Sequence, residues 1–483
     1  MTKAVVLGGG FAGVLVAKVL SRHVDEVTVV EGGRYPVGPV PRPGLPQAFH
    51  SHVLVTAGAE ALETLLPGTL EALLARGAHR RGLPDGALIL SAEGWFSRHE
   101  TGAFMVSCSR WLMDHVIRER ALADGTVSVR EGTRVLGLAA DASRVTGVVV
   151  AGEDGCAQTV RADIVVDATG RRSRAGHWLA AIGLPDVEEE VVDPGLAYST
   201  RIYRAPAGLA ADIPAIMVHP GPENGRPGYG ATLFPIEDGR WIFTLTGTRA
   251  ATPPTDERGF TDCARTLRSP IAAELLAAAE PLGSVRPFRA TANRRRYFER
   301  LPVPEGFLVV GDALTAVNPV YSHGMSVALL GAVRLDRELE RRGAAPSVLP
   351  GVQAAVAEVA TTSWRMATEQ DRARAAANGA ANGSGIGAAN GSGNGSAAVS
   401  EAGRRMRARV SRAVLTSPAL MTQLFRSQTL VSSPAAARGP GPSAGSHPPL
   451  DTDEAVAQFP ALREWWVSGR RNQPPTREEN RDD

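Results

Sequence analysis

Lysine is almost absent from this chain. Of the 52 lysine and arginine residues only Lys3 and Lys18 are lysines, so arginine carries nearly all of the positive charge. The formal net charge is only +2 at pH 7, which gives no strong electrostatic field and argues against nucleic acid as a partner. The shortage of lysine also limits any chemistry that depends on a primary amine.

Cysteine and long apolar runs are scarce as well. Cys108, Cys156 and Cys263 are scattered and show no spacing typical of metal ligands, so we expect free thiols, a reducing, cytoplasmic location and no metal site. The sequence contains no run of about 18 apolar residues and no leader pattern. We therefore expect no transmembrane segment and no signal peptide.

A glycine fingerprint stands in the first 31 residues. Gly8-x-Gly10-x-x-Gly13 separates a short apolar strand from a helix, and Glu31 ends the next strand. Glycine is needed at these positions for a tight turn, for close approach of a pyrophosphate, and for packing of the helix against the strand. Phe11 and Ala12 complete the turn. The pattern predicts dinucleotide binding, with Glu31 on an adenosine ribose, and fits a nicotinamide or a flavin equally well.

The order of expected elements indicates one interrupted domain and one inserted domain. Strands and helices alternate through residues 1–187 and again through 286–345, with one amphipathic helix expected over 58–77. Residues 188–285 are rich in strands without intervening helices, which is typical of an antiparallel sheet. The chain therefore leaves an α/β domain, builds a second domain, and returns.

The C-terminal region, residues 346–483, is expected to be helical. Residues 375–398 are rich in Ala, Asn, Gly and Ser and are expected to form a flexible linker. The stretch from about residue 433 is rich in proline and charge, and we expect it to fray.

Two later motifs resemble those of the FAD-dependent aromatic hydroxylase superfamily. "DATG" (167–170) ends a strand, and "GDALTAVNPVYSHGM" (311–325) forms an unusually long connection between a strand and a helix. The resemblance implies a Rossmann-like FAD-binding domain of the hydroxylase (GR2) type over 1–187 and 286–345, a substrate-binding sheet domain over 188–285, and FAD as cofactor.

The resemblance also implies roles for individual residues. Asp312 would bind the ribityl chain, the loop from Pro319 to His323 would wrap the flavin edge, and Gly324 and Met325 would begin a helix aimed at the flavin pyrimidine. A helix N-terminus suits the negative charge of a reduced flavin. Two weaker assignments follow, which are Arg110 in "SRWLM" near the cofactor and Val135 near the adenine.

Four stretches are similar to the bacterial polyether epoxidases, which are squalene-epoxidase-like flavin monooxygenases. They are "PRPGLPQAFHSHVL" (41–54), residues 167–206, "ANRRRYFERLP" (292–302) and "GDALTAVNPVYSHGMSVA" (311–328). The resemblance implies epoxidation of carbon–carbon double bonds of a polyketide or terpenoid polyene through a flavin C4a-hydroperoxide, as in antibiotic biosynthesis. O2 would be the oxidant, and electrons would come from NAD(P)H directly or from a separate flavin reductase.

The substrate would be a hydrophobic alkene, and the flavin would supply the reactivity, so no catalytic side chain is required. His50 is the one candidate for a catalytic residue, as a hydrogen-bond partner of the flavin or its hydroperoxide. The expected pocket residues are Gln47, Phe49, His50, Tyr198, Phe234, Pro235 and Tyr321, with Thr200 on the same sheet face as Tyr198.

Four alternatives stay open. A flavin-dependent halogenase needs a lysine and a Trp-x-Trp motif, and only "EGWFSR" with a single tryptophan is present. An alkene reductase of the geranylgeranyl-reductase type, an aromatic hydroxylase of the phenol type, and an inactive flavin-binding scaffold share the same domain.

Overall fold

The computed structural model describes residues 1–209, 212–221, 228–248, 251–381, 401–432 and 450–471. Its first sheet is parallel and five-stranded within this part of the chain, in the order β19-β11-β1-β2-β7. Apolar runs such as "AVVL" suit strands that are covered on both faces. The strands are β1 (Lys3–Leu7), β2 (Glu26–Val30), β7 (Val127–Arg130), β11 (Ile164–Asp167) and β19 (Phe307–Val309).

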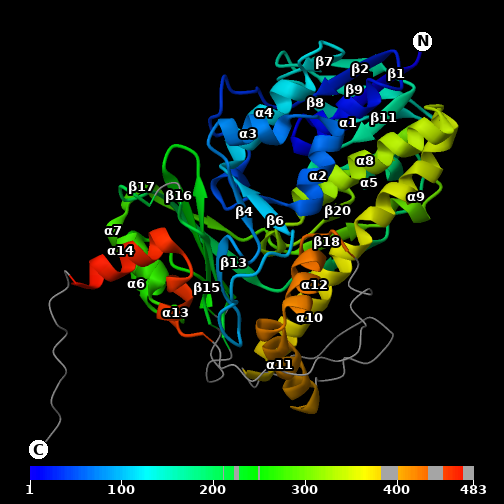
Figure 1. Ribbon diagram of the computed structural model, residues 1–483. Coiled ribbons are helices and arrows are strands. Elements are labelled where there is room, and N and C mark those ends of the chain that lie inside the picture. Colours follow the sequence, from blue (N-terminus) through cyan, green and yellow to red (C-terminus); the bar gives the residue numbers. More distant parts are fainter. Residues whose placement is uncertain (210–211, 222–227, 249–250, 382–400, 433–449, 472–483) are drawn as a thin grey trace, which may run out of the picture.

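Helices pack with this sheet to form the core of the first domain (Figure 1). They are α1 (Phe11–Leu20), α2 (Thr56–Leu65), α3 (Thr69–Ala75), α4 (Arg110–Ala121), α5 (Ala175–Ala181), α8 (Gly324–Arg342) and α9 (Leu349–Val359). The single helix expected over 58–77 is in fact two helices. Gly68, at φ +79°, lies between them in a left-handed conformation that a continuing helix does not allow.

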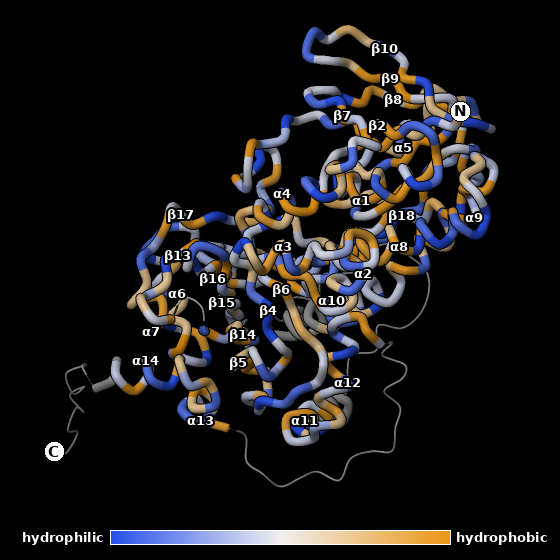
Figure 2. The backbone as a smooth tube through the Cα atoms, turned by 45° about the horizontal axis from the view of Figure 1, so that its top comes forward, coloured by the Kyte–Doolittle hydropathy of each residue, from blue (hydrophilic) through white to orange (hydrophobic). Residues whose placement is uncertain are grey.

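A three-stranded antiparallel meander extends the first domain at the end of the molecule opposite α11 (Figures 1 and 2). It consists of β8 (Arg134–Ala140), β9 (Val145–Ala151) and β10 (Ala157–Arg161). The outermost strand, β10, is mostly exposed, in keeping with its polar residues.

The second sheet is six-stranded in the described residues, in the order β17-β13-β16-β15-β14-β5. Its strands are β5 (Ala87–Leu90), β13 (Leu196–Arg204), β14 (Ala215–Val218), β15 (Gly230–Ile236), β16 (Arg240–Thr248) and β17 (Glu280–Phe288), and α6 (Glu257–Arg265) and α7 (Ile271–Ala278) pack with them. The sheet exceeds the expected 188–285 range, because β5 pairs in parallel with β14 and β17 runs to Phe288.

Two small sheets join the large ones. The first, β3-β6-β4, contains β3 (Val53–Val55), β4 (His79–Gly82) and β6 (Phe104–Ser107). The second, β12-β18-β20, contains β12 (Glu189–Val192), β18 (Asn293–Arg296) and β20 (Thr315–Ala316). Through β20 the second small sheet holds the long connection after β19.

The C-terminal region is helical in its described residues. It contains α10 (Thr361–Ala381), α11 (Glu401–Thr416), α12 (Pro418–Gln428), α13 (Thr452–Ala457) and α14 (Pro460–Arg471). The expected linker overlaps α10 up to Ala381, and its remainder lies outside the described residues. No described helix is long and apolar enough to cross a membrane.

The expectation that the chain frays from about residue 433 is wrong for residues 450–471. Val456, Leu462 and Trp466 are buried in the core of the second sheet, beside α6 and α7 (Figure 1). Apolar residues at helical spacing form a buried face there, and the burial of this face outweighs the surrounding charge and proline. Residues 433–449 and 472–483 lie outside the described part.

Candidate flavin and substrate site

The glycine fingerprint forms a tight turn from β1 into α1. A Cβ atom on Gly13 would lie 1.8 Å from the carbonyl oxygen of Gly8, so only glycine fits there. Gly8 itself has φ +93°, a conformation that side chains disfavour. A Cβ on Gly10 would meet nothing within 4 Å, so this face of the turn is open. Since no side chain caps α1, its first N–H groups are available to an anion.

Glu31 ends β2 as expected, but protein groups already engage its carboxylate. It accepts hydrogen bonds from the Gly9 N–H at 2.8 Å and the Gly33 N–H at 2.6 Å, and it pairs with Arg42. Burial alone would raise the pKa of Glu31, but Arg42 and the two backbone donors outweigh it and hold the pKa below its usual value. A ribose would share Glu31 with Arg42 or displace it.

Arg42 and Tyr35 were not found by sequence reasoning. Tyr35 donates its hydroxyl hydrogen bond to the Gly9 carbonyl at 2.9 Å, and the Arg42 guanidinium lies 5.0 Å from the Tyr35 ring centroid. Both residues belong to a loop without periodicity, so nothing in the local sequence placed them at the fingerprint.

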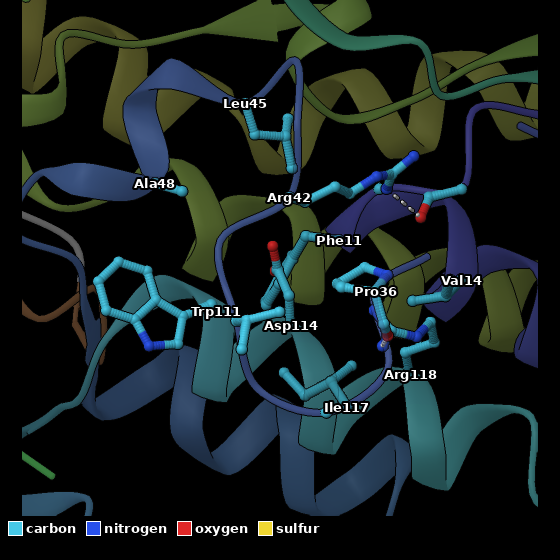
Figure 3. A pocket seen from close by; sticks show the side chains of 14 residues that line it. Phe11, Val14, Pro36, Arg42, Leu45, Ala48, Trp111, Asp114, Ile117 and Arg118 are labelled. Carbon is cyan, nitrogen blue, oxygen red and sulfur yellow. Dashed lines mark hydrogen bonds between the residues drawn. The ribbon is translucent and has the colours of Figure 1, made fainter. Parts of the chain in front are cut away.

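A pocket that opens to solvent lies between the fingerprint, this loop and α4. In Figure 3, Asp114 points from α4 toward Phe11, Trp111 extends sideways beneath Ala48, and Leu45 lies on the side opposite α4. Two guanidinium groups line it, those of Arg42 and Arg118, together with the open N-terminus of α1. This combination suits the phosphates of a dinucleotide. The full set of lining residues is Gly9, Gly10, Phe11, Val14, Pro36, Gly38, Val40, Arg42, Leu45, Ala48, Trp111, Asp114, Ile117 and Arg118.

The connection over residues 311–323, named here the flavin loop, returns the chain to the fingerprint. Gly311 has φ +60°, and a Cβ on it would lie 3.0 Å from the Cβ of Ala12. Among the described residues no hydrogen bond to the half-buried Asp312 carboxylate is present, and burial raises its pKa against the charges of Arg171 and Arg110. A carboxylate in this state suits hydrogen bonding to a polyhydroxyl chain.

Gly324 and Met325 begin α8 beside Asp312. A Cβ on Gly324 would lie 3.9 Å from Asp312 Oδ1, so the helix N-terminus and this carboxylate are neighbours, as the flavin assignment requires. Met325 is buried in the core of the first domain. Pro319 is exposed at the start of a short 3₁₀ turn within the flavin loop.

Arg110 begins α4 and faces the fingerprint. Its Nε donates to Asp114 Oδ1 at 2.7 Å, and its guanidinium lies 5.3 Å from the centroid of the Phe11 ring. Val135 lies on β8, opposite Val150, and packs against the core. The cofactor roles of both residues stay predictions.

The predicted substrate residues of the 46–52 loop meet the second sheet. His50 Nδ1 lies 2.8 Å from Thr200 Oγ1, which lies 2.8 Å from Thr244 Oγ1, and Ser51 Oγ lies 2.9 Å from that same atom. The loop is also lined with rings, because His50 lies 5.0 Å from Phe288 between ring centroids. The ring centroids of Phe49 and Trp111 lie 6.0 Å apart. The backbone carbonyl of Gln47 accepts a hydrogen bond from the His50 backbone N–H.

The remaining pocket candidates divide into two groups. Tyr198 and Tyr321 lie at the flavin loop, since the Tyr198 hydroxyl donates to Asn318 Oδ1 at 2.6 Å. Phe234 instead is buried in a core cluster under the sheet, and the Pro235 carbonyl accepts from Ser107 Oγ at 2.8 Å. The structure therefore brings together the loop and tyrosine candidates, whereas Phe234 packs in a core cluster and the Pro235 backbone is hydrogen-bonded to Ser107 of β6.

His50 gives a pH-dependence prediction. Burial lowers its pKa from 6.5 to about 4, so the folded protein binds fewer protons than the unfolded chain between these values. Stability should fall as pH drops from 6.5 toward 4, by up to about 3 kcal/mol for this residue. In urea unfolding at pH 7.5 and pH 5, His50→Asn should lose part of this dependence. The exposed His177→Asn should keep it; equal pH dependence in both variants would contradict the assignment.

Comparisons with known proteins agree with this geometry. The family model of the FAD binding domain matches residues 1–349. Protein Rv3254 of Mycobacterium tuberculosis (strain ATCC 25618 / H37Rv) is 31% identical over 355 residues, which cover 71% of this chain and 74% of that protein. The 6-methylpretetramide 4-monooxygenase of Streptomyces rimosus is 27% identical over 378 residues, which cover 73% of this chain and 79% of that enzyme.

A solved structure supports the fold. The flavin-dependent halogenase CmlS aligns with a TM-score of 0.62 at 18% identity, over 97% of this chain and 77% of that one, and a likeness at this identity concerns the fold alone. The family model covers more than half of the chain. The site offers a flavin dinucleotide an open glycine turn, a helix N-terminus and an acid, Asp312, whose carboxylate accepts no hydrogen bond from the described part of the chain. This chain belongs to the FAD-binding-domain family of FAD-dependent monooxygenases, and FAD is its cofactor.

Proposed function

We propose that the protein epoxidises an electron-rich carbon–carbon double bond of a hydrophobic polyketide or terpenoid chain, using FAD and O2. Reduced FAD with O2 supplies an electrophilic oxygen atom when it is bound. The protein must then hold the alkene against the flavin and keep water out. Electrons would come from NAD(P)H directly or through a separate flavin reductase.

The observation that carries the proposal is the pairing of polar groups on the substrate side. His50, Thr200 and Thr244 are buried and hydrogen-bond to one another, and burial keeps His50 neutral by lowering its pKa to about 4. A neutral, mutually bonded set is a poor base for a phenol. An alkene requires no deprotonation before oxygen transfer, so a substrate site lined by these neutral groups suits an alkene. The neighbouring rings of Phe49 and Phe288 offer apolar surface.

Aromatic hydroxylation is the second candidate. Its support is the 27% identity to the Streptomyces rimosus enzyme, whose name describes a monooxygenase acting on 6-methylpretetramide. Such a substrate would lie against the same residues of the 46–52 loop, the flavin loop and the second sheet.

Halogenation is disfavoured by the positions of the lysines. Lys3 forms an ion pair with Glu26 at 2.7 Å, and Lys18 pairs with Asp124. Both lie on the nucleotide-binding unit, on β1 and α1, and neither lines the substrate side.

The test uses purified protein with FAD, NADH or NADPH, and an independent flavin reductase present or omitted. The substrates are a linear trisubstituted polyene deuterated at its alkene carbons and a deuterated polycyclic phenol, both under ¹⁸O2. We expect the polyene product to carry one ¹⁸O and all of its deuterium. Oxygenation of the phenol alone, with exchange of ring deuterium for hydroxyl, would establish the second candidate instead.

A further inference from the structure

The C-terminal helix α10 reaches the flavin loop through one buried carboxylate. The Asp371 side chain has no exposed surface, and its Oδ1 accepts a hydrogen bond from the Tyr321 hydroxyl at 2.6 Å. Its Oδ2 accepts from Asn318 Nδ2 at 3.0 Å and from Asn293 Nδ2 at 2.6 Å. Two of these three donors belong to the flavin loop, and the third belongs to β18, the strand that pairs with it.

Asp371 thereby fixes the orientation of the Asn318 amide. With its Nδ2 donating to Asp371, Asn318 presents its Oδ1 to the Tyr198 hydroxyl at 2.6 Å and to the Val320 N–H at 3.2 Å. The Asn318 N–H in turn donates to Asn293 Oδ1 at 2.7 Å. One residue of the flavin loop is thus bonded to α10, to β13 of the second sheet and to the next turn of its own loop.

A second tie to the C-terminal region lies five residues further along the loop. His323 Nε2 lies 2.9 Å from the Gln428 carbonyl oxygen at the end of α12, and its Nδ1 lies 3.0 Å from Ser363 Oγ on α10. Nε2 must carry the proton to donate to a carbonyl, so Nδ1 accepts from the serine hydroxyl. The C-terminal helices therefore hold both sides of the segment that follows Asp312.

We infer that Asp371 is a positioning residue for the flavin: it shapes residues 318–321 of the flavin loop for cofactor binding, although it lies on the C-terminal region outside the matched FAD-binding domain. The inference rests on the proposed function of the flavin loop. A carboxylate suits this place because each of these three partners is a donor, and charge-assisted bonds to an ionised acceptor are the stronger kind. An amide of the same shape would direct an N–H at one of these donors.

The experiment measures FAD binding by the full-length protein with Asp371→Asn. We expect the dissociation constant for FAD, followed by quenching of flavin fluorescence, to rise about tenfold or more. The visible circular dichroism of the bound flavin should change too, because the loop geometry around the ring has changed. A role in fold stability alone would lower the apoprotein melting temperature and leave both flavin measurements unaltered.

Two further variants sharpen the test. Glu369→Gln removes an exposed carboxylate that pairs with Arg365 on the same helix, and it should leave FAD binding unchanged. Tyr321→Phe removes one donor to Asp371, should raise the dissociation constant by a smaller factor, and should add little to Asp371→Asn in the double variant. If Asp371→Asn does not fold, the FAD affinity and the flavin dichroism of Tyr321→Phe alone test the inference.

Wild-type affinity and wild-type dichroism in both Asp371→Asn and Tyr321→Phe would overturn the inference. A wild-type protein that binds no FAD would instead overturn the proposed function.

Discussion

Gly13→Ala is expected to yield a protein with a damaged fold and no measurable FAD binding. Its new methyl group would lie 1.8 Å from the Gly8 carbonyl oxygen, a backbone atom that cannot move without opening the turn between β1 and α1. We expect the free energy of unfolding to fall by about 2 kcal/mol or more, measured by urea denaturation of the apoprotein. FAD binding should fail in the same preparation.

Gly10→Ala is expected to separate FAD binding from folding, which Gly13→Ala cannot do. Its methyl group would meet no protein atom within 4 Å and would point into the pocket over the fingerprint. The apoprotein should therefore melt as the wild type does, whereas its FAD affinity should fall on the order of 100-fold because a phosphate no longer fits.

Gly176→Ala on α5 serves as the control for both glycine variants, since its methyl group would meet only an ordinary contact at 3.5 Å to Val187. A Gly10→Ala protein that binds FAD normally would show that the cofactor phosphates lie elsewhere.

Asp312→Asn is expected to separate cofactor affinity from stability. Burial raises the pKa of Asp312, so the folded apoprotein holds this proton more tightly than the unfolded chain does. The stability that Asp312 contributes therefore falls as the pH rises above 3.8, the usual pKa of an aspartate. At neutral pH the charged, buried carboxylate lowers the free energy of unfolding of the apoprotein. Removing the charge should leave the apoprotein at least as stable, while FAD affinity falls about tenfold or more.

The matched control is Asp336→Asn, on the same helix that follows the flavin loop. Asp336 pairs with Arg22 and His23, far along α8 from its N-terminus, so its removal should cost stability and spare FAD affinity. If Asp312→Asn destabilised the apoprotein and kept full affinity, Asp312 would be a structural residue and the ribityl assignment would fail.

The sequence predicted the elements whose signal is local. The fingerprint, its flanking strands and the strands β13, β15 and β16 follow from apolar runs, glycine positions and alternation, and all are present. It did not predict that β5 joins the second sheet, because "ALIL" is a short apolar run that carries no information on its partner. The partner, β14, lies far along the chain.

The candidate site divides in the same way. Asp312, Gly324 and His50 could be proposed from the sequence because each belongs to a motif of several residues, and the structure places them at the flavin loop or against the second sheet. Arg42 and Asp371 belong to no motif that the sequence alone could single out for them. One lies in an irregular loop and the other on a helix, and their importance depends on which distant groups fold against them.

The composite origin of the second sheet determines when it can be completed during synthesis. β5 leaves the ribosome long before β14, its pairing partner, and α13 and α14, which cover the same core, emerge much later still. Until Val456, Leu462 and Trp466 are available, the apolar surface that they cover stays in contact with water. Chains that stop before residue 450 should therefore aggregate, even though every element of their flavin domain has already been made.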